Sequence, residues 1–260
     1  MKYTVMSIAG SDSGSGAGIQ ADLKTIMMHD LWGVCVITSI TAQNTKKIKK
    51  IYRLPLDIIE SQLDALLEDY DIRTIKIGML LSPEIIELVS NKIKNLGIDI
   101  IIDPVMRSTS GTDLIKGDYV STLCKSLIPY STMITPNIEE AKILSQIEIS
   151  NQSDVKEACK KIIELGTKSV IIKGGHINPS ISEVFDTLYY SKKFYYFKKK
   201  RVKGNFHGLG CTFSSSIACN IAKGYDIVSS VKLSEVFIEN VINNSIKIAH
   251  GLIPVNQKYI

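Results

Sequence analysis

The sequence lacks the features of secreted, zinc-binding and membrane-spanning proteins. Its five cysteines are scattered and form no C-x-x-C pair, which favours reduced thiols over disulfides or a zinc site. No apolar run is long enough to cross a bilayer, and no signal-like segment opens the chain. We therefore expect a cytoplasmic protein that has no membrane partner.

The chain also lacks a strong excess of charge. Its net charge is +5 over 260 residues, and the lysine-rich segments at 46–50 and 198–201 have no aromatic or arginine-rich recognition motif beside them. We interpret both segments as solvated loops and expect no nucleic-acid partner. Because no internal repeat, linker or break in composition interrupts the chain, we expect one domain over residues 1–260.

Two common phosphate-binding signatures are missing. A Walker A loop needs Gly-Lys, and this dipeptide does not occur in the chain. A dinucleotide fingerprint needs a carboxylate at the end of the strand after the glycine turn. That strand, expected at 33–40, is followed by Thr41-Ala42-Gln43-Asn44, which has none. A nicotinamide-dependent oxidoreductase is therefore disfavoured.

What is present is a regular alternation of apolar β-branched runs and amphipathic helices. Strands are expected at 3–9, 33–40, 74–77, 99–102, 132–135 and 170–173, a hairpin at 184–197, and helices after Pro55, Pro83 and Pro136 and over 154–165. This pattern predicts βαβ units around a buried parallel sheet, and ligands of such folds bind at the carboxyl ends of the strands.

Several polar residues follow these strands, and each has two interpretations. Asp103 occupies a strand end, which favours a functional role for it more strongly than for an average loop carboxylate. The segment 107–113 is either a lid over the site or an inert surface loop. Asp22 is either a surface residue near a helix start or a group that pairs with a substrate. Gln43 is either a loop residue or an amide that matches a heteroaromatic ring edge.

The stretch from Lys203 to Cys219 turns from glycine-rich to small and apolar. Gly208 and Gly210 permit a tight bend, and a helix is expected to start at about Cys211. The free amides of a helix start form a phosphate site after such a turn. A glycine turn before an ordinary core helix is the alternative.

Seven segments together resemble the hydroxymethylpyrimidine/phosphomethylpyrimidine kinases of thiamin biosynthesis, within the ribokinase-like superfamily. They occur in family order over nearly the whole chain: AGSDSGSGAGIQADLKT at 9–25, TAQNT at 41–45, KIGML at 76–80, DPVM at 103–106, TPNIEEA at 135–141, IKGGH at 172–176 and HGLGCT at 207–212. The resemblance implies a three-layer α/β/α sandwich with a mostly parallel sheet, a homodimer, and Mg²⁺ and ATP. The implied acceptor is 4-amino-5-hydroxymethyl-2-methylpyrimidine, phosphorylated twice in succession.

The resemblance also implies roles for individual residues. Gln43 would bind the aminopyrimidine edge, with Gly10, Asp22, Met79 and Val105 around it. Asn137 and Glu140 would support magnesium and phosphate binding, with Asp103 nearby as a metal ligand, and Lys173 would face the nucleotide phosphates. Gly208, Leu209, Gly210 and Cys211 would form the anion hole, with Cys211 as the base if the helix start lowers its pKa.

Leu209 departs from the family, which usually has H-G-T-G-C where this chain has H-G-L-G-C. The anion hole should survive, because it is built from backbone amides, but a hydroxyl contact to phosphate is lost. Two other functions stay open at this point. One is pyridoxal kinase, whose related branch has an apolar residue where Gln43 stands. The other is a non-catalytic module that binds a nucleotide or a pyrimidine.

Overall fold

The computed structural model describes residues 3–107, 118–174, 183–202 and 204–258, and a nine-stranded sheet forms its centre. Its strands follow the order β3-β2-β1-β4-β5-β6-β7-β8-β9. They span Thr4–Asp12 (β1), Trp32–Gln43 (β2), Ile48–Arg53 (β3), Ile72–Ile77 (β4), Asp99–Ile102 (β5), Met133–Ile134 (β6), Ser169–Ile172 (β7), Glu183–Tyr190 (β8) and Lys193–Lys200 (β9). The six strands from β2 to β7 in this order are parallel, and β3, β8 and β9 are antiparallel to their neighbours. The predicted parallel sheet and hairpin are therefore confirmed.

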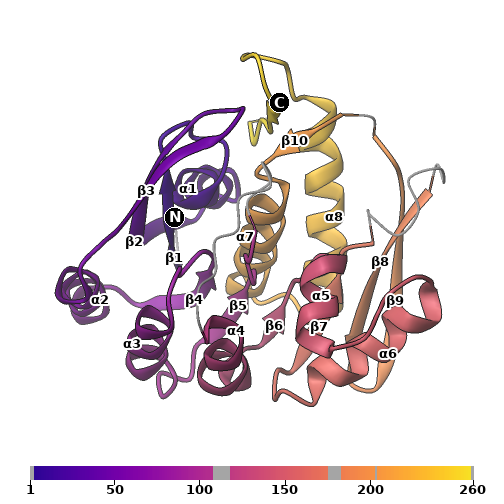
Figure 1. Cartoon of the computed structure of the whole chain (residues 1–260), viewed down its shortest axis with the longest axis horizontal. Coiled ribbons are helices and arrows are strands. Elements are labelled where there is room, and N and C mark those ends of the chain that lie inside the picture. The colour runs from indigo at the N-terminus through magenta and orange to yellow at the C-terminus, as the bar shows by residue number, and fades with distance from the viewer. Residues whose placement is uncertain (1–2, 108–117, 175–182, 203, 259–260) are drawn as a thin grey trace.

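Helices cover both faces of the sheet (Figure 1). They span Gly18–Met28 (α1), Leu56–Asp69 (α2), Pro83–Ile93 (α3), Tyr119–Thr122 (α4), Ile138–Ser145 (α5), Gln152–Ile163 (α6), Leu209–Ala222 (α7) and Ile227–Asn243 (α8). A π-helical turn at Leu123–Leu127 and a 3₁₀-helical turn at Ile128–Tyr130 follow α4. One core cluster joins the sheet to α2, α3, α5 and α6, a second joins it to α1, α7 and α8, and a third, smaller one joins α8 to the C-terminal tail. The three-layer α/β/α architecture is confirmed.

The two lysine-rich segments correct the sequence analysis. Lys49 and Lys50 lie in β3 and Lys198 to Lys200 lie in β9, so the loop interpretation is wrong for these lysines, whereas Lys46, Lys47 and Arg201 lie outside the strands. Side chains alternate between the two faces of a strand, so an edge strand can direct lysines to solvent while its apolar residues pack inward. Lysine on edge strands also discourages pairing with other chains.

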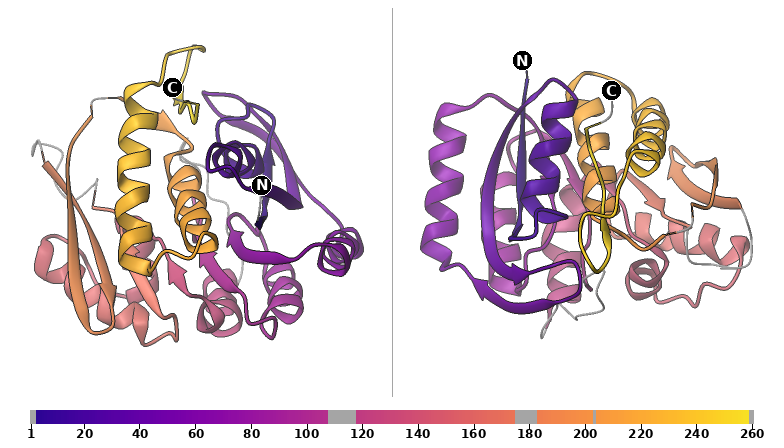
Figure 2. Two further views of the ribbon diagram at one scale, coloured as in Figure 1. Left: turned by 180° about the vertical axis from the view of Figure 1, so that it is seen from behind. Right: turned by 90° about the horizontal axis from the view of Figure 1, so that it is seen from above.

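The described part of the chain after α8 is not helical. The helix α8 ends at Asn243, and the tail that follows becomes extended. Its residues Ile253–Pro254 (β11) pair in parallel with Phe206–His207 (β10), the segment directly before α7 (Figure 2). The tail also reaches the end of β2, where the Leu252 amide donates to the Thr45 carbonyl over 2.8 Å. The C-terminal segment thus braces two of the predicted site segments.

No helix among the described residues is both long and apolar enough to cross a membrane. All five cysteines are free, as their spacing predicted.

Candidate active site

The carboxyl ends of the parallel strands meet at one cavity of about 1720 Å³. Every residue that the sequence analysis singled out for the site lines it, except Asp22: Gly10, Gln43, Met79, Asp103, Val105, Asn137, Glu140, Lys173, Gly208, Leu209, Gly210 and Cys211. These residues lie near the ends of β1 and β2, in the segments that follow β4, β5, β6 and β7, or at the starts of α5 and α7. This agrees with the rule that open α/β sheets bind ligands at their strand ends. The segments 108–113 and 175–176, which include most of the expected lid, lie outside the described residues.

The start of α7 provides amides without helical partners. The first intrahelical bond joins the Thr212 amide to the Gly208 carbonyl over 2.9 Å, so the amides of Leu209, Gly210 and Cys211 have no acceptor within the helix. The helix begins at Leu209, two residues before the predicted start. The cause is Gly208, which has φ of 89° and acts as the N-cap.

Gly210 has a different function from Gly208, because it lies inside the helix. A Cβ at this position would lie 3.2 Å from Asp103 Oδ2 and 3.4 Å from Lys173 Nζ. These two side chains form an ion pair, with Lys173 Nζ 3.0 Å from Asp103 Oδ1. Burial alone would lower the pKa of Lys173, but Asp103 and Glu140 outweigh it and raise this pKa. A lysine ammonium group therefore lies directly beside the free amides of α7.

Asn137 and Glu140 form the first turn of α5. The Asn137 side chain accepts from the Glu140 amide and the Glu140 carboxylate accepts from the Asn137 amide, each over 2.9 Å. This capping box explains both residue types without a ligand. Burial raises the pKa of Glu140 to about 7, although Lys173 acts in the opposite direction.

The donor set here suits magnesium but not a metal held by protein alone. The described residues contain no group of three or more His, Cys, Asp or Glu side chains that could hold a metal ion. Asp103 and Glu140 offer two carboxylates beside Lys173. Mg²⁺ bound to a nucleotide keeps water and phosphate ligands and needs only one or two carboxylates. The residues present therefore fit a magnesium ion that arrives with phosphates.

Cys211 does not meet the condition set for a base. Burial raises the pKa of its thiol to about 11, and nearby Lys76 offsets this only in part. The partial charge of the helix start was expected to lower this pKa. In this enclosed position desolvation has the larger effect, so Cys211 is a neutral thiol at neutral pH.

Asp22 is not a surface residue, so that interpretation is wrong. Its side chain is 0% exposed, and Lys76 Nζ lies 2.8 Å from Asp22 Oδ1 in a buried ion pair. Ser7 and Ser215 donate to the same carboxylate over 2.6 and 2.8 Å. Lys76, and not Asp22, reaches the cavity. Direct contact between Asp22 and a substrate would require this ion pair to open.

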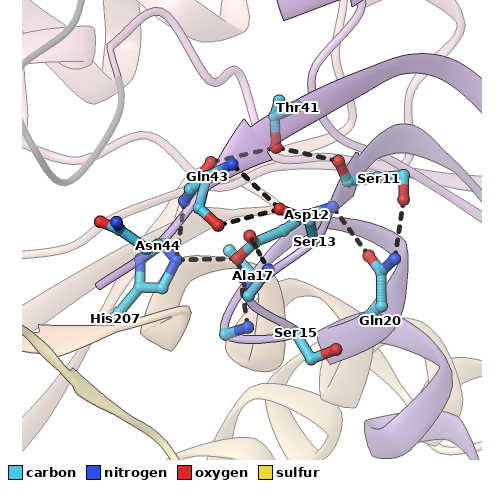
Figure 3. A network of polar contacts seen from close by, with 12 residues as sticks. Ser11, Asp12, Ser13, Ser15, Ala17, Gln20, Thr41, Gln43, Asn44 and His207 are labelled. Carbon is cyan, nitrogen blue, oxygen red and sulfur yellow. Dashed lines mark hydrogen bonds and ion pairs between the residues drawn. The ribbon is translucent and has the colours of Figure 1, made fainter. Parts of the chain in front are cut away.

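Gln43 is the last residue of β2 rather than a loop residue. Its side-chain amide lies between Thr41 Oγ1, at 3.3 Å from Gln43 Oε1, and His207 Nε2, at 3.0 Å from Gln43 Nε2 (Figure 3). The same His207 nitrogen lies 3.0 Å from Asp12 Oδ2. The glycine turn after β1 and the segment before α7 therefore meet around Gln43.

The sequence analysis assigned no role to Asp12, Lys76 or His207. All three lie inside the segments that carry the family resemblance, and all three are polar or charged. Their position inside these segments was the signal by which the sequence could have identified them as site residues. Their buried contacts with Gln43, Asp22 and each other join residues up to 195 positions apart, which spacing along the chain does not reveal.

The cavity continues beyond Lys173 toward α8 and the β8–β9 hairpin. Phe213, Val236 and Ile242 give this part apolar walls. Lys199 contributes charge there, with its Nζ 2.6 Å from Asp186 Oδ2 and 2.9 Å from Glu235 Oε2. The cavity is thus large enough for two ligands placed end to end, since single ligand pockets usually measure about 300–1000 Å³.

Comparisons with known proteins agree with this geometry. The family model described as phosphomethylpyrimidine kinase matches residues 12–256. Hydroxymethylpyrimidine/phosphomethylpyrimidine kinase of Aquifex aeolicus is 40% identical over 95% of this chain and 96% of its own length. The protein of the same description from Bacillus subtilis is 38% identical over 98% and 94%.

Solved structures of two kinds are similar. Phosphomethylpyrimidine kinase of Clostridium difficile 630 is 41% identical, with a TM-score of 0.82 over 93% of this chain and 100% of that one. An ADP complex of Bacillus subtilis pyridoxal kinase is 31% identical, with a TM-score of 0.90 over 99% and 98%. With a family model that covers nearly all of it and relatives of about 40% identity, the chain belongs to the phosphomethylpyrimidine kinase family.

Proposed function

We propose that this protein transfers phosphate from ATP to 4-amino-5-hydroxymethyl-2-methylpyrimidine and then to the resulting monophosphate, as a step of thiamin biosynthesis. The observation that carries the proposal is the shared cavity, which Gln43 lines together with the free amides at the start of α7. The Gln43 side chain suits an aminopyrimidine edge, and the free amides suit a phosphate. Lys173 follows β7, Asp103 follows β5 and Glu140 lies in α5, and all three line the same cavity.

The pyrimidine subsite is formed by Gln43 and an apolar wall. Gly10 packs closely against Met79, since a Cβ at Gly10 would lie 2.3 Å from Met79 Cε. We assign Met79 and Val105 to the flat faces of the ring and Gln43 to its edge. Asp22 contributes through Lys76, whose ammonium group it holds at the cavity.

The phosphate subsite neutralises charge. The amides of Leu209, Gly210 and Cys211 face the transferred phosphoryl group, and Lys173 faces the nucleotide phosphates. Magnesium, when bound, would be held by Asp103 and Glu140 and would neutralise phosphate charge. Phosphoryl transfer passes through a loose transition state, so alignment and charge neutralisation provide most of the catalysis. A neutral Cys211 thiol is compatible with such a reaction, because little help from a base is needed.

The direct test is incubation of the purified protein with Mg²⁺, ATP and the hydroxymethylpyrimidine, with products followed by mass. We expect the monophosphate to appear first and the diphosphate to follow. Pyrimidine binding without phosphorylated product would instead support a non-catalytic module. Lys173→Met serves as the control, because it removes the ammonium group from the phosphate subsite.

Pyridoxal kinase is the second candidate, favoured by the TM-score of 0.90 to the Bacillus subtilis pyridoxal kinase. Gln43 argues against it as the main activity, because its amide matches a donor–acceptor ring edge. We expect kcat/KM for the pyrimidine to exceed that for pyridoxal by at least about 10-fold, in line with the loss of paired polar contacts. A higher kcat/KM for pyridoxal would reverse the assignment.

We also propose one domain over the whole chain, a cytoplasmic location and a homodimer. The homodimer is supported by an apolar pair on the outer strands of the sheet. Ile40 of β2 and Tyr52 of β3 are cross-strand neighbours, and they are 48% and 58% exposed. Exposed apolar side chains that cluster in this way are typical of protein interfaces.

A further inference from the structure

The contacts around His207 contain a conflict between hydrogen-bond donors. His207 Nε2 is 3.0 Å from both Asp12 Oδ2 and the Gln43 side-chain nitrogen. An imidazole nitrogen either carries one hydrogen or offers one lone pair, and it cannot do both. A side-chain amide nitrogen only donates. Therefore one of the two contacts fails unless a group changes its orientation.

Asp12 decides which state His207 adopts. Its carboxylate accepts from the backbone amides of Gly14, Gly16 and Ala17 over 2.8, 3.1 and 2.9 Å. Burial alone would raise the pKa of Asp12, but the hydrogen bond from His207 and those from the backbone together hold this pKa below its usual value. Asp12 is thus ionised and can only accept. Nε2 of His207 must carry the hydrogen that it donates to Asp12.

The Gln43 amide must then turn its oxygen toward His207. Rotation by 180° about the last side-chain bond exchanges its oxygen and nitrogen. In the rotated form Oε1 and Asp12 Oδ2 share the single hydrogen of His207 Nε2 in a three-centre hydrogen bond, and the amide nitrogen donates to Thr41 Oγ1. Thr41 donates its single hydroxyl hydrogen to the Ser11 carbonyl over 3.0 Å, so it has none left for a Gln43 oxygen. Both neighbours therefore require the same orientation.

We propose that Asp12 and His207 fix the amide orientation of Gln43, and that His207 is thereby a positioning residue for substrate selection. This inference rests on the proposed pairing of Gln43 with the pyrimidine edge. One amide hydrogen and one oxygen lone pair are used by Thr41 and His207, which leaves one donor and one acceptor in a fixed order. A 4-aminopyrimidine offers the complementary order, with a ring nitrogen that accepts and an amino group that donates. A 4-oxopyrimidine offers the opposite order.

The surroundings of His207 prevent the ring from adapting. Its side chain is 7% exposed, and a Cβ at Gly16 would lie 2.3 Å from His207 Cδ2, so the ring packs directly on this glycine. Its backbone pairs with Pro254 in the β10–β11 ladder. Nδ1 is buried and has no partner among the described residues, so Nε2 makes the contacts that orient the ring. Gly208, the N-cap of α7, follows directly in the chain, which links ring recognition to the anion hole.

The test compares two ring analogues rather than overall activity. The ratio of kcat/KM for 4-amino-5-hydroxymethyl-2-methylpyrimidine to that for its 4-oxo analogue is measured in wild type, His207→Asn and His207→Gln. Asparagine cannot place a donor where Nε2 lies, whereas glutamine can. We expect the ratio to fall at least about 10-fold in His207→Asn, as for the loss of one hydrogen bond that orients Gln43. In His207→Gln the ratio should return to within about threefold of the wild-type ratio. A merely structural role would lower both kcat/KM values together and leave the ratio unchanged, and that result would overturn the inference.

Two further measurements separate this inference from the proposed function. Nitrogen-15 NMR of the histidine ring in the intact protein should show hydrogen on Nε2, and a ring with hydrogen on Nδ1 alone overturns the inference. Gln43→Leu should abolish the preference for the 4-amino analogue. If Gln43→Leu leaves the preference intact, the proposed pairing of Gln43 is wrong and the inference fails with it. If Gln43→Leu abolishes the preference while His207→Asn does not, only the inference fails.

Discussion

Single residues in this cavity owe their chemistry to burial more than to charge. Cys211 lies at a helix start and near Lys76, both of which favour a thiolate, and its pKa is nevertheless raised to about 11. Glu140 lies at another helix start, beside Lys173, and its pKa is raised to about 7. Desolvation of the charged form explains both shifts. The same enclosure strengthens every contact that a bound phosphate would make there.

Cys211→Ala should slow the two phosphorylations about equally. The hydroxymethyl group must lose a proton in the first step, whereas the monophosphate accepts phosphate without losing one, but a thiol whose pKa is raised to about 11 is neutral and cannot accept that proton. We therefore expect kcat of each step to fall by less than about 10-fold, short of the roughly 10²-fold loss typical of a removed proton-transfer group. The measurement is single-turnover kinetics of each step.

Cys219→Ala is the matched control for this experiment. It removes a second thiol from α7 that is buried in the core and does not line the cavity. Both steps should keep the wild-type rate in this variant. A selective loss of about 10²-fold or more in the first step of Cys211→Ala would show that Cys211 accepts the proton despite its raised pKa.

Glu140 makes stability depend on pH. Its pKa in the folded protein is about 7, above its ordinary value of 4.5, so the folded state keeps a proton that the unfolded state releases between these values. The free energy of unfolding should therefore fall as pH rises from about 4.5 to about 7. Glu140→Gln keeps the capping box but does not titrate. Between pH values of about 5 and 7.5 in urea titrations, wild type should lose up to about 3 kcal/mol more than this variant.

If wild type and Glu140→Gln lose the same free energy of unfolding over this range, Glu140 is ionised in the folded protein. In that case Lys173 would offset the cost of burial in full. The capping box itself is tested separately by Asn137→Ala, which should cost about 1 kcal/mol at every pH.

At the scale of elements, the start of α7 depends on two glycine turns that interlock. Gly208 has φ of 89°, and a Cβ there would lie 1.8 Å from the Gly16 carbonyl oxygen. Gly16 in turn packs against the His207 ring. The turn after β1 and the turn before α7 can therefore approach only because neither glycine carries a side chain.

Gly208→Ala should thus affect both stability and phosphate binding, and Gly224→Ala is its matched control. Gly224 has a similar φ of 91°, but a Cβ there would meet nothing within 4 Å. We expect Gly224→Ala to lower the free energy of unfolding by about 1 kcal/mol, from backbone strain alone, with kcat/KM unchanged. Gly208→Ala adds a steric clash and should exceed about 3 kcal/mol, with a loss of kcat/KM for ATP. Chemical denaturation and steady-state kinetics provide both measurements, and equal costs would show that the turns do not need to approach.

At the scale of the whole molecule, the proposed homodimer can be tested at the outer strands. Tyr52→Lys places a charge beside Ile40 on the exposed surface of β2 and β3. We expect the mass measured by light scattering to change from that of a dimer to that of a monomer, because an unpaired charge is costly to bury in an apolar interface. Ile248→Lys changes an exposed apolar residue of the tail and should leave the dimer intact. A dimer that survives Tyr52→Lys would locate the interface elsewhere.

The sequence by itself determined the order of elements and most of the cavity lining. Apolar runs predicted the parallel strands, and prolines predicted the starts of α2 and α3, because these signals act over a few neighbouring residues. The residues at the strand ends were identifiable for the same reason. Because the carboxyl ends of parallel strands lie at one edge of a sheet, the sequence already implied that Gln43 and Lys173, which stand at such ends, line one site.

Only the tertiary structure decided what these residues contact and in which protonation state. Asp22 was expected to face a surface or a substrate, but it is paired with Lys76, 54 positions away. Gln43 was identified, but its orientation depends on His207, 164 positions away, and on Asp12. The pKa of Cys211 depends on how completely the fold encloses it, not on its place at a helix start. Burial and long-range pairing are properties of the packed chain, and no local pattern encodes them.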